Sequence, residues 1–447
     1  MHPKTIARHA AMQALSAMER DGAMLSGALG AALRLVAVPD STRAFTRELV
    51  SGSLRHLSWI DWTLEPLLKT SLDKLDSSVR AALRLATYER AWLHTPASAV
   101  ANEYAGLMRV ARLKSATGFV NAVARRLPAE PRALPGDWPA TRKISIEFSH
   151  PQWLVERWLA RFGPEECAAL CCANNQIAPL CLRVNTRRAA REEVFEKLRA
   201  RELKARLGDL SPESILIEAA GAPDEWPEWK AGHIIAQDEA AQLVSLLAAP
   251  KSGSVVIDCA AAPGGKTTHL AQIMGDEGLI IACDAAPGRV KLVVDNARRL
   301  GLACIAAKAG DLRALGAALP SADCVLLDAP CSGTGTLRRR PDAKNRKTPR
   351  QLEELVVLQR ELLAAAAILV KPGGALIYST CSLEPEENEG QIQEFLRHNA
   401  DWKIADDFSL LTAETIARVA TSAGFIQTFP HRHDCDGMFA AKLIRQF

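Results

Sequence analysis

The chain has 447 residues, of which 48% are hydrophobic and 24% are charged. This length predicts two or three domains, and the composition excludes a largely disordered chain because it allows sizeable cores to be buried. The net charge of +4 is too small to indicate a nucleic-acid partner by itself. No run of about 18 or more uncharged apolar residues occurs, so the sequence predicts no membrane span.

Basic residues are concentrated in the first part of the chain. Residues 1–143 contain 20 Lys and Arg against 12 Asp and Glu, whereas the remainder contains 35 against 39. This imbalance fits a polyanion-binding module joined to a near-neutral catalytic module, and fits equally a helical domain with solvated arginines. The 11 cysteines form no CxxC pair, and no signal peptide is evident. We therefore expect a reduced, cytoplasmic protein with mostly buried thiols.

The predicted elements change in kind along the chain. Residues 1–127 predict an all-helical domain, because apolar residues recur there at spacings of three and four. Residues 128–143 contain four prolines and predict a linker. Residues 144–235 mix helix with short strands and predict a small α+β subdomain. From residue 236 to residue 447 strands and helices alternate, which predicts an α/β domain with a mostly parallel, doubly wound sheet.

Acidic side chains follow the strands of this predicted sheet. Four strands end at or just before an acid, and these acids are Asp258, Asp284, Asp311 and Asp328. Ligands of doubly wound sheets bind at the carboxyl ends of the strands. We therefore expect these acids to lie around one site.

A loop of small residues joins the first of these strands to a helix. It comprises Cys259, Ala260, Ala261, Ala262, Pro263, Gly264, Gly265 and Lys266, and it matches neither the Walker nor the GxGxxG spacing. Small residues let the backbone approach a ligand, and the helix N-terminus offers free N–H groups, although a plain tight turn has the same composition. Asp284 could accept hydrogen bonds from ribose hydroxyls, and Asp311 could reach a purine. The pattern predicts a nucleoside ligand without a triphosphate, such as S-adenosylmethionine, with Lys266 steadying the loop.

Two cysteines follow neighbouring strands, Cys331 in Asp328-Ala-Pro-Cys and Cys381 in Ser379-Thr-Cys-Ser. One cysteine at a strand end is more often buried packing, but two beside a cofactor loop indicate chemistry. A thiolate that attacks carbon 6 of a cytosine lets carbon 5 accept a methyl group, and a second thiol can assist release. The residues alone leave open which cysteine attacks. Asp328 could hydrogen-bond the base near nitrogen 3.

A basic loop follows Cys331 and contains Arg338, Arg339, Arg340 and Lys344. We expect these side chains to contact RNA phosphates beside a flipped base, the alternative being a solvated loop. The segment 431–435 has the residue types of a metal site but no partner cluster, so no metal is predicted.

Together these motifs resemble the RNA cytosine-5 methyltransferase family named after the Sun protein. The resemblance is carried by Leu182–Thr186, Gln237–Ala241, Asp258–Thr267, Asp328–Gly335, Arg340–Asp342, Ser379–Ser382, Glu386–Glu389 and Asp436–Phe439. In the first part of the chain, Glu48–Gly52, Leu83–Ala86, Val100–Glu103 and Gly118–Val123 resemble NusB-like all-helical RNA-binding domains.

The resemblance implies a Rossmann-like methyltransferase domain that uses S-adenosylmethionine. It implies that Cys381 is the nucleophile and that Cys331 assists release of the product. It also implies cofactor contacts by the loop after Asp258 and by Asp284, Asp311 and Asp328, and the family has a basic residue that matches Arg289.

The implied substrate is a cytosine in small-subunit (16S) rRNA, and we expect a monomer. Two positions depart from the family pattern, because Asn345 stands where Trp is common and Ala241 where Ser is common. Both bear on RNA contacts more than on chemistry. The alternatives are the same reaction on tRNA or another rRNA site and a non-catalytic RNA-binding assembly factor. A DNA methyltransferase would need a longer segment than the about 48 residues between Cys331 and Ser379.

Overall fold

The computed structural model describes residues 2–218 and 221–447. The chain divides into two compact units, one comprising Met1–Gln176 and Leu337–Arg346 and the other Ile177–Thr336 and Lys347–Phe447. The division at Gln176 differs from the expected linker at 128–143, since the helices after that linker belong to the first unit. Within the described residues, no helix is long and apolar enough to cross a membrane, and no group of three or more His, Cys, Asp or Glu could hold a metal ion.

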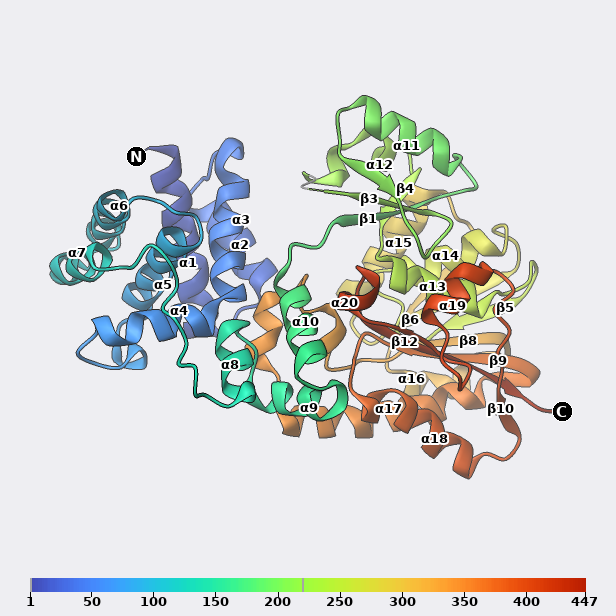
Figure 1. The fold of residues 1–447 in the computed structure, drawn as a ribbon. Helices are drawn as coiled ribbons and strands as arrows, with labels where there is room; N and C mark the ends of the chain where they lie inside the picture. Colours follow the sequence, from blue (N-terminus) through green and yellow to red (C-terminus); the bar gives the residue numbers. More distant parts are fainter. Residues whose placement is uncertain (1, 219–220) are drawn as a thin grey trace. The chain divides into compact units, whose positions relative to one another are not determined.

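The first unit is helical, as the spacing of apolar residues predicts (Figure 1). Its α-helices are α1 (Pro3–Asp21), α2 (Leu25–Leu35), α3 (Asp40–Arg55), α4 (Leu57–Leu64), α5 (Ser77–Ala91), α6 (Ala97–Val110), α7 (Thr117–Arg125), α8 (Ala140–Glu147), α9 (Gln152–Phe162) and α10 (Pro164–Asn175). Small and aliphatic side chains of α1, α3, α5, α6 and α7 form its main core. The start of α5 is fixed by Asp76, whose carboxylate accepts hydrogen bonds from two backbone N–H groups of the first turn.

Leu337–Arg346 belongs to the helical unit although it lies far along the sequence. Lys344 in this segment is 1% exposed. Its Nζ donates to the carbonyls of Arg55 (2.8 Å) and Phe148 (3.3 Å) and to Oδ1 of Asn175 (2.7 Å). Burial lowers the pKa of Lys344 to about 7. Lys344 therefore joins the ends of three helices within this unit.

We expect Lys344→Met to destabilise the helical unit by about 2–4 kcal/mol, because three buried oxygens would lose their donor. The measurement is the thermal and urea unfolding of the full chain. Lys114→Met, at an exposed position of the same unit, is the matched control and should have little effect. Equal effects of the two changes would contradict the assignment of Lys344 as an internal tie.

The second unit contains a small antiparallel sheet in the order β2-β3-β1-β4. Its strands are β1 (Leu180–Val184), β2 (Ala205–Leu207), β3 (Ser214–Ile217) and β4 (Ile234–Ala236). Helices α11 (Arg191–Ala200) and α12 (Pro227–Lys230) accompany it, and side chains of α11 pack with those of the strands in one core. This arrangement matches the α+β character expected of the segment.

The large sheet of the second unit has eight strands in the order β10-β12-β9-β8-β5-β6-β7, with β11 paired to β12. The strands are β5 (Val255–Asp258), β6 (Leu279–Asp284), β7 (Ile305–Ala309), β8 (Ala322–Asp328), β9 (Val370–Thr380), β10 (Trp402–Ile404), β11 (Ile426–Thr428) and β12 (Met438–Arg445). The five strands β5 to β9 pair in parallel, whereas β10, β11 and β12 pair antiparallel. The predicted doubly wound, mostly parallel sheet is confirmed.

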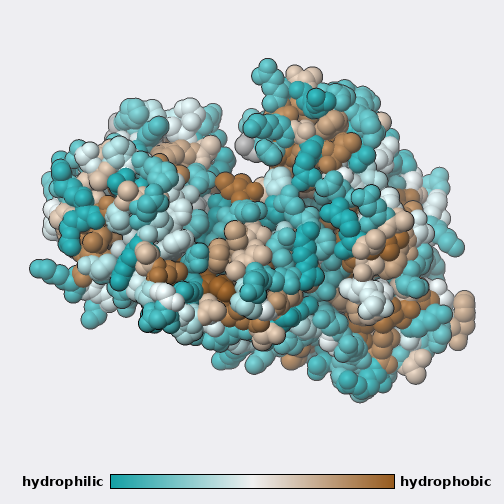
Figure 2. Space-filling view, viewed as in Figure 1, coloured by the Kyte–Doolittle hydropathy of each residue, from teal (hydrophilic) through white to brown (hydrophobic). Residues whose placement is uncertain are grey.

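Helices cover both faces of this sheet (Figure 1). One face is covered by α13 (Glu239–Ala248), α14 (Gly265–Ile273), α15 (Pro287–Leu300) and α19 (Ala413–Val419), and the other by α16 (Leu312–Leu315), α17 (Pro349–Ile368) and α18 (Glu389–His398). A short helix, α20 (Pro430–His433), precedes β12. The central strands are therefore apolar on both sides, as parallel strands between helices must be. On the molecular face in Figure 2, hydrophobic residues form separate patches among hydrophilic ones.

The strand order reverses around β5, which has β6 on one side and β8 on the other. Such a reversal opens a crevice at the carboxyl ends of the strands, where doubly wound proteins bind ligands. Asp258 ends β5 and Asp328 ends β8, so both acids lie at this crevice.

Candidate active site

The pairing of β8 with β9 aligns Asp328 directly with Ser379. The Ser379 hydroxyl donates to Oδ1 of Asp328 at 2.8 Å, and Nζ of Lys266 donates to Oδ2 at 2.7 Å. Burial lowers the pKa of Lys266, but the charge and hydrogen bond of Asp328 outweigh burial, and the net pKa is raised. The fold thus holds the charged Lys266, at the start of α14, together with a carboxylate at the end of β8.

Cys331 lies three residues after the end of β8 at Asp328, and Cys381 directly follows the end of β9 at Thr380. Both are half-buried, and their Sγ atoms lie 3.4 Å apart. The two thiols therefore lie side by side; that they face one ligand site stays a prediction. The backbone N–H of Gly335 donates to the carbonyl of Cys381 at 2.9 Å, which ties the two cysteine loops to each other.

A buried carboxylate, Glu387, holds the loop that carries Cys331. Glu387 is fully buried, and its side chain accepts hydrogen bonds from the backbone N–H of Ser332 (2.7 Å), from the Ser332 hydroxyl and from Nε2 of Gln359 (2.9 Å). The same Gln359 amide donates to the carbonyl of Pro330 at 2.9 Å. The residues on both sides of Cys331 are therefore fixed by one network.

The surroundings of Cys331 disfavour its thiolate. The hydrogen bond to Cys381 raises the pKa of Cys331 most, followed by burial and by the negative charges of Glu387 and Asp328. Cys381, in contrast, interacts electrostatically with the ammonium of Lys266, and this interaction helps to raise the pKa of Lys266. These surroundings therefore favour the neutral thiol of Cys331, hydrogen-bonded to Cys381.

The small-residue loop, residues 259–266, approaches the backbone of α15 closely. Gly264 has a φ of +100°, and a Cβ added there would lie 3.1 Å from the Cα of Val293, so a side chain would be both strained and crowded. The side chains of Cys259, Ala261 and Ala262 are buried, whereas Pro263 is exposed. Small residues at a helix N-terminus let a ligand approach the backbone and its free N–H groups closely.

Asp284 supports this loop from the end of β6. Its Oδ2 accepts from the N–H of Ala262 at 3.2 Å, and its Oδ1 accepts from the N–H of Ala286 at 3.1 Å. Arg289 donates to the carbonyl of Ala262 at 2.8 Å and lies 3.6 Å from Asp284. Each carboxylate oxygen can accept a further hydrogen bond, so a contact of Asp284 with ribose hydroxyls stays a prediction.

Asp311 lies at the end of the edge strand β7. It caps the short helix α16, and its carboxylate pairs with Arg313 at 2.6 Å, while Arg313 also pairs with Glu361 at 2.6 Å. The structure therefore shows Asp311 engaged locally, and its contact with a purine stays a prediction.

The structure corrects part of the prediction for the basic loop. Arg338 is 2% exposed and Lys344 is 1% exposed, so burial excludes phosphate contacts by these side chains in this structure. The ammonium of Lys344 is used inside the helical unit, which the local sequence does not reveal. Arg339 is half-buried and Arg340 exposed, and RNA contacts by these two stay predictions.

Three residues of the site carry roles that the sequence analysis does not assign. Glu387 lies in the Glu386–Glu389 motif, Ser379 directly precedes the Thr-Cys pair, and Arg183 lies in the Leu182–Thr186 motif. Each motif is visible in the sequence, but the bond that each residue makes is not. Their partners come from other elements of the fold.

Asp258 generates a prediction on pH dependence. Burial raises the pKa of Asp258 to about 6, against the hydrogen bond from Thr267. Because the folded pKa exceeds the unfolded value of 3.8, the folded state is favoured while the group is protonated, and this advantage is lost as pH rises through 6. Wild type should lose this stability as pH rises, whereas Asp258→Asn should not. The free energy of unfolding of Asp258→Asn minus that of wild type should therefore increase by up to about 3 kcal/mol between pH 4 and pH 7.5.

Urea unfolding at both pH values measures this difference. Asp295→Asn, at an exposed position of α15, is the control and should show no such change. A difference that stays constant over this range would show that Asp258 is ionised throughout.

The thiol pair generates a second prediction. In Cys381→Ala the hydrogen bond that raises the pKa of Cys331 most is removed, so Cys331 should form its thiolate more readily. We expect faster alkylation of Cys331 by iodoacetamide at pH 8 than in wild type, measured by peptide mass spectrometry. The exposed Cys172 provides an internal reference whose rate should not change. An unchanged Cys331 rate would show that Glu387, Asp328 and burial alone set its pKa.

Family models match all three parts of the chain. The model described as 16S rRNA methyltransferase RsmB/F matches residues 245–444, and the NusB family model matches residues 5–128. The ferredoxin-like domain of RsmF/B-like methyltransferases matches residues 150–223.

Similar proteins align with nearly the whole length of this chain. A probable ribosomal RNA small subunit methyltransferase B from Synechocystis sp. is 35% identical and covers 98% of this chain and 99% of its own length. A probable ribosomal RNA small subunit methyltransferase B from Bacillus subtilis is 32% identical, with 99% of each chain covered. The crystal structure of PH0851 has a TM-score of 0.82 at 28% identity and covers 99% of both chains. The structure of NSun6 from Pyrococcus horikoshii with SFG has a TM-score of 0.60 at 25% identity, covering 66% of this chain and 98% of its own. The chain belongs to the RsmB/F family of 16S rRNA methyltransferases.

Proposed function

We propose that this protein transfers a methyl group from S-adenosylmethionine to carbon 5 of a cytosine in small-subunit rRNA, through a covalent bond between Cys381 and carbon 6. The observation that carries the proposal is the pair of thiols 3.4 Å apart beside the Lys266–Asp328 ion pair. Two thiols with different electrostatic surroundings suit a reaction in which one attacks and the other assists release.

The first step uses the groups at the tips of β8 and β9. Lys266 favours a negative charge on Cys381, which attacks carbon 6 and forms the C–S bond. The electrons of the C5=C6 bond then become available at carbon 5, and Asp328 supports the base by hydrogen bonding near nitrogen 3. When bound, the methyl donor would supply its methyl group to carbon 5, and the electrons of the methyl–sulfur bond would remain on the donor's sulfur.

The second step returns the base to aromaticity. The proton on carbon 5 must pass to a base, the C5=C6 bond re-forms, and the C–S bond to Cys381 breaks to give back the thiolate. Once Cys381 is bonded to carbon, it no longer favours the proton on Cys331, so the largest cause of the raised pKa of Cys331 is removed. Cys331 can then act as the group that assists proton removal and release.

The methyl donor would be held by the small-residue loop and its neighbours. Gly264 leaves no space for a side chain against α15, α14 begins directly after it, and Asp284 adds a carboxylate beside the loop. These features fit S-adenosylmethionine, which supplies a methyl group on a positively charged sulfur. The proposed contacts are made by residues 259–266, Asp284, Arg289, Asp311 and Asp328.

The rRNA substrate is proposed from the relatives named ribosomal RNA small subunit methyltransferase B, which align along nearly the full chain. The excess of basic residues in residues 1–143 suits RNA binding by the helical part. The alternatives are the same reaction on tRNA or another rRNA site and an RNA-binding factor without catalysis.

The test incubates wild type, Cys381→Ala and Cys331→Ala with labelled S-adenosylmethionine and unmodified small-subunit rRNA. Incorporated methyl is counted, its position is read by nucleoside mass spectrometry, and denaturing gels detect a protein–RNA adduct. We expect Cys381→Ala to lose methylation by about 10⁴-fold or more, since no nucleophile remains. Cys331→Ala should accumulate the adduct. Cys172→Ala, which removes an exposed cysteine outside the pair, is the control.

Other results of this methylation and adduct test would each lead to a different conclusion. An adduct in Cys381→Ala and none in Cys331→Ala would assign the attack to Cys331. Methylation of tRNA but not of rRNA by wild type would keep the mechanism and reject the substrate. RNA binding without methyl transfer to any of these RNAs would reject catalysis.

A further inference from the structure

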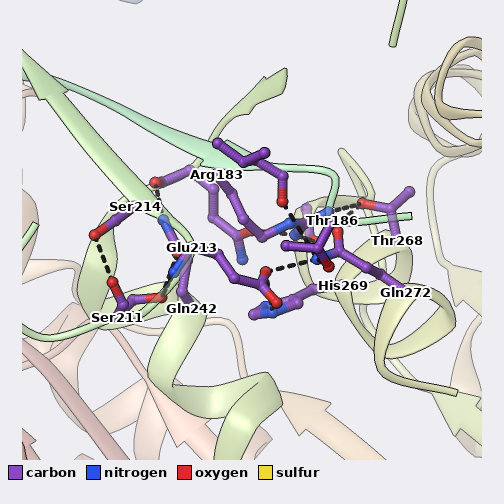
Figure 3. Close-up of polar contacts among 12 residues, drawn as sticks. Arg183, Thr186, Ser211, Glu213, Ser214, Gln242, Thr268, His269 and Gln272 are labelled. Atoms are coloured by element: carbon purple, nitrogen blue, oxygen red, sulfur yellow. Dashed lines mark hydrogen bonds and ion pairs between the residues drawn. The ribbon is translucent and has the colours of Figure 1, made fainter. Parts of the chain in front are cut away.

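Arg183 of β1 is wholly buried where the small sheet meets helix α14 (Figure 3). Its Nη1 donates to the carbonyl of Gly265 at 2.6 Å and to Oε1 of Gln237, and its Nη2 donates to the Thr268 hydroxyl at 3.0 Å. Gly265 and Thr268 belong to the first turn of α14, which begins at the end of the small-residue loop. The guanidinium of Arg183 therefore fixes the first turn of α14, the helix that follows the small-residue loop.

The charge of Arg183 is not paired by direct contact with an acid. Across residues 2–218 and 221–447, the hydrogen-bond acceptors of this guanidinium are the uncharged oxygens of Gly265, Gln237 and Thr268. Burial lowers the pKa of Arg183 to about 9, so the side chain is still charged at neutral pH. Burying a charge in this way is costly, and it calls for a function beyond packing.

Glu213, whose negative charge acts on Arg183, contributes to a separation of charge along α14. Glu213 accepts from Nε2 of Gln272 at 2.7 Å and lies 3.0 Å from Nε2 of His269, both of which lie beyond the first turn (Figure 3). The positive charge of Arg183 thus sits at the start of α14 and the negative charge of Glu213 further along. This order has the same direction as the helix dipole, and both make the start of the helix more attractive to an anion.

We propose that Arg183 is a positioning residue that fixes the first turn of α14 and supplies the positive potential favouring the carboxylate of the methyl donor. The inference rests on the proposed use of S-adenosylmethionine. The carboxylate is the donor's only anionic group, and the start of α14 adjoins the loop proposed to bind the donor. Arg183 does not touch the donor in this proposal but acts through the backbone at Gly265 and through its charge.

A purely structural role predicts a different result. If Arg183 only held the loop in shape, its loss would weaken every ligand of that loop by the same factor. If its charge also acts on the carboxylate, its loss should weaken a ligand that has the carboxylate more than one that lacks it. The ratio of the two affinities therefore separates the two roles.

The experiment measures binding by calorimetry to S-adenosylhomocysteine and to its decarboxylated analogue, S-adenosyl-3-thiopropylamine. The full chain is used as wild type, Arg183→Met and Arg183→Lys. Arg187→Met is the matched control, because Arg187 follows the same strand and donates to the carbonyl of Gly275, beyond the other end of α14. Thermal unfolding is recorded for every variant.

We expect Arg183→Met to bind S-adenosylhomocysteine roughly tenfold or more weakly, while the analogue loses clearly less, because a buried charge acts over several ångströms. Arg183→Lys should keep the wild-type ratio of the two affinities even where both fall. Arg187→Met should change neither. Equal losses for both ligands in Arg183→Met, or a changed ratio in Arg183→Lys, would overturn the electrostatic role.

Two further results keep the inference separate from the proposed function. Wild type that binds neither ligand would reject the proposed methyl donor and the inference with it. Wild type that binds both, with an unchanged ratio in every variant, would reject only the role of Arg183. Should Arg183→Met fail to fold, Arg183→Gln replaces it, because glutamine keeps a hydrogen-bond donor but lacks the charge; equal losses for both ligands in Arg183→Gln would overturn the electrostatic role.

Discussion

The parallel pairing of β8 with β9 is the constraint on which the site depends. It aligns Asp328 with Ser379, and the chain leaves the two strands side by side at their carboxyl ends. Cys331 and Cys381 follow at short distances and meet at 3.4 Å, while Lys266 reaches Asp328 from the helix after β5. A register shift in this pairing would separate the thiols and the carboxylate together.

Two chemically identical side chains, Cys331 and Cys381, lie in different electrostatic surroundings. Cys331 is held between backbone groups fixed by a fully buried Glu387, and negative charges there favour the neutral thiol. Cys381 lies within the influence of the ammonium of Lys266. The difference depends on which charges each thiol meets and not on the cysteines themselves. In the same way, environments that move two titrating groups apart assign acid and base roles in many enzymes.

The part of the second unit before β5 supports the helix that follows the small-residue loop from outside the large sheet. Arg183 and Gln272 connect strand β1 and the segment after it with helix α14. In the helical unit, Lys344 performs a comparable task by binding oxygens of three helices. In both places a long cationic side chain spans elements that aliphatic packing alone would not fix in position, because each of its donors has a defined direction.

The sequence by itself determined the alternation of strands and helices, the acids at the strand ends, the small-residue loop and the meeting of two cysteines. These features follow from local periodicity and from the rule that parallel strands end at the same edge. Only the tertiary structure decided that Lys344 and Arg338 are internal, that Glu387 holds Cys331, and that Arg183 reaches Gly265. The partners of Lys344 lie up to 289 residues away along the chain, so no local pattern reports them. Whether a charged side chain faces solvent or a buried acceptor depends on such distant partners, and folding alone brings them together.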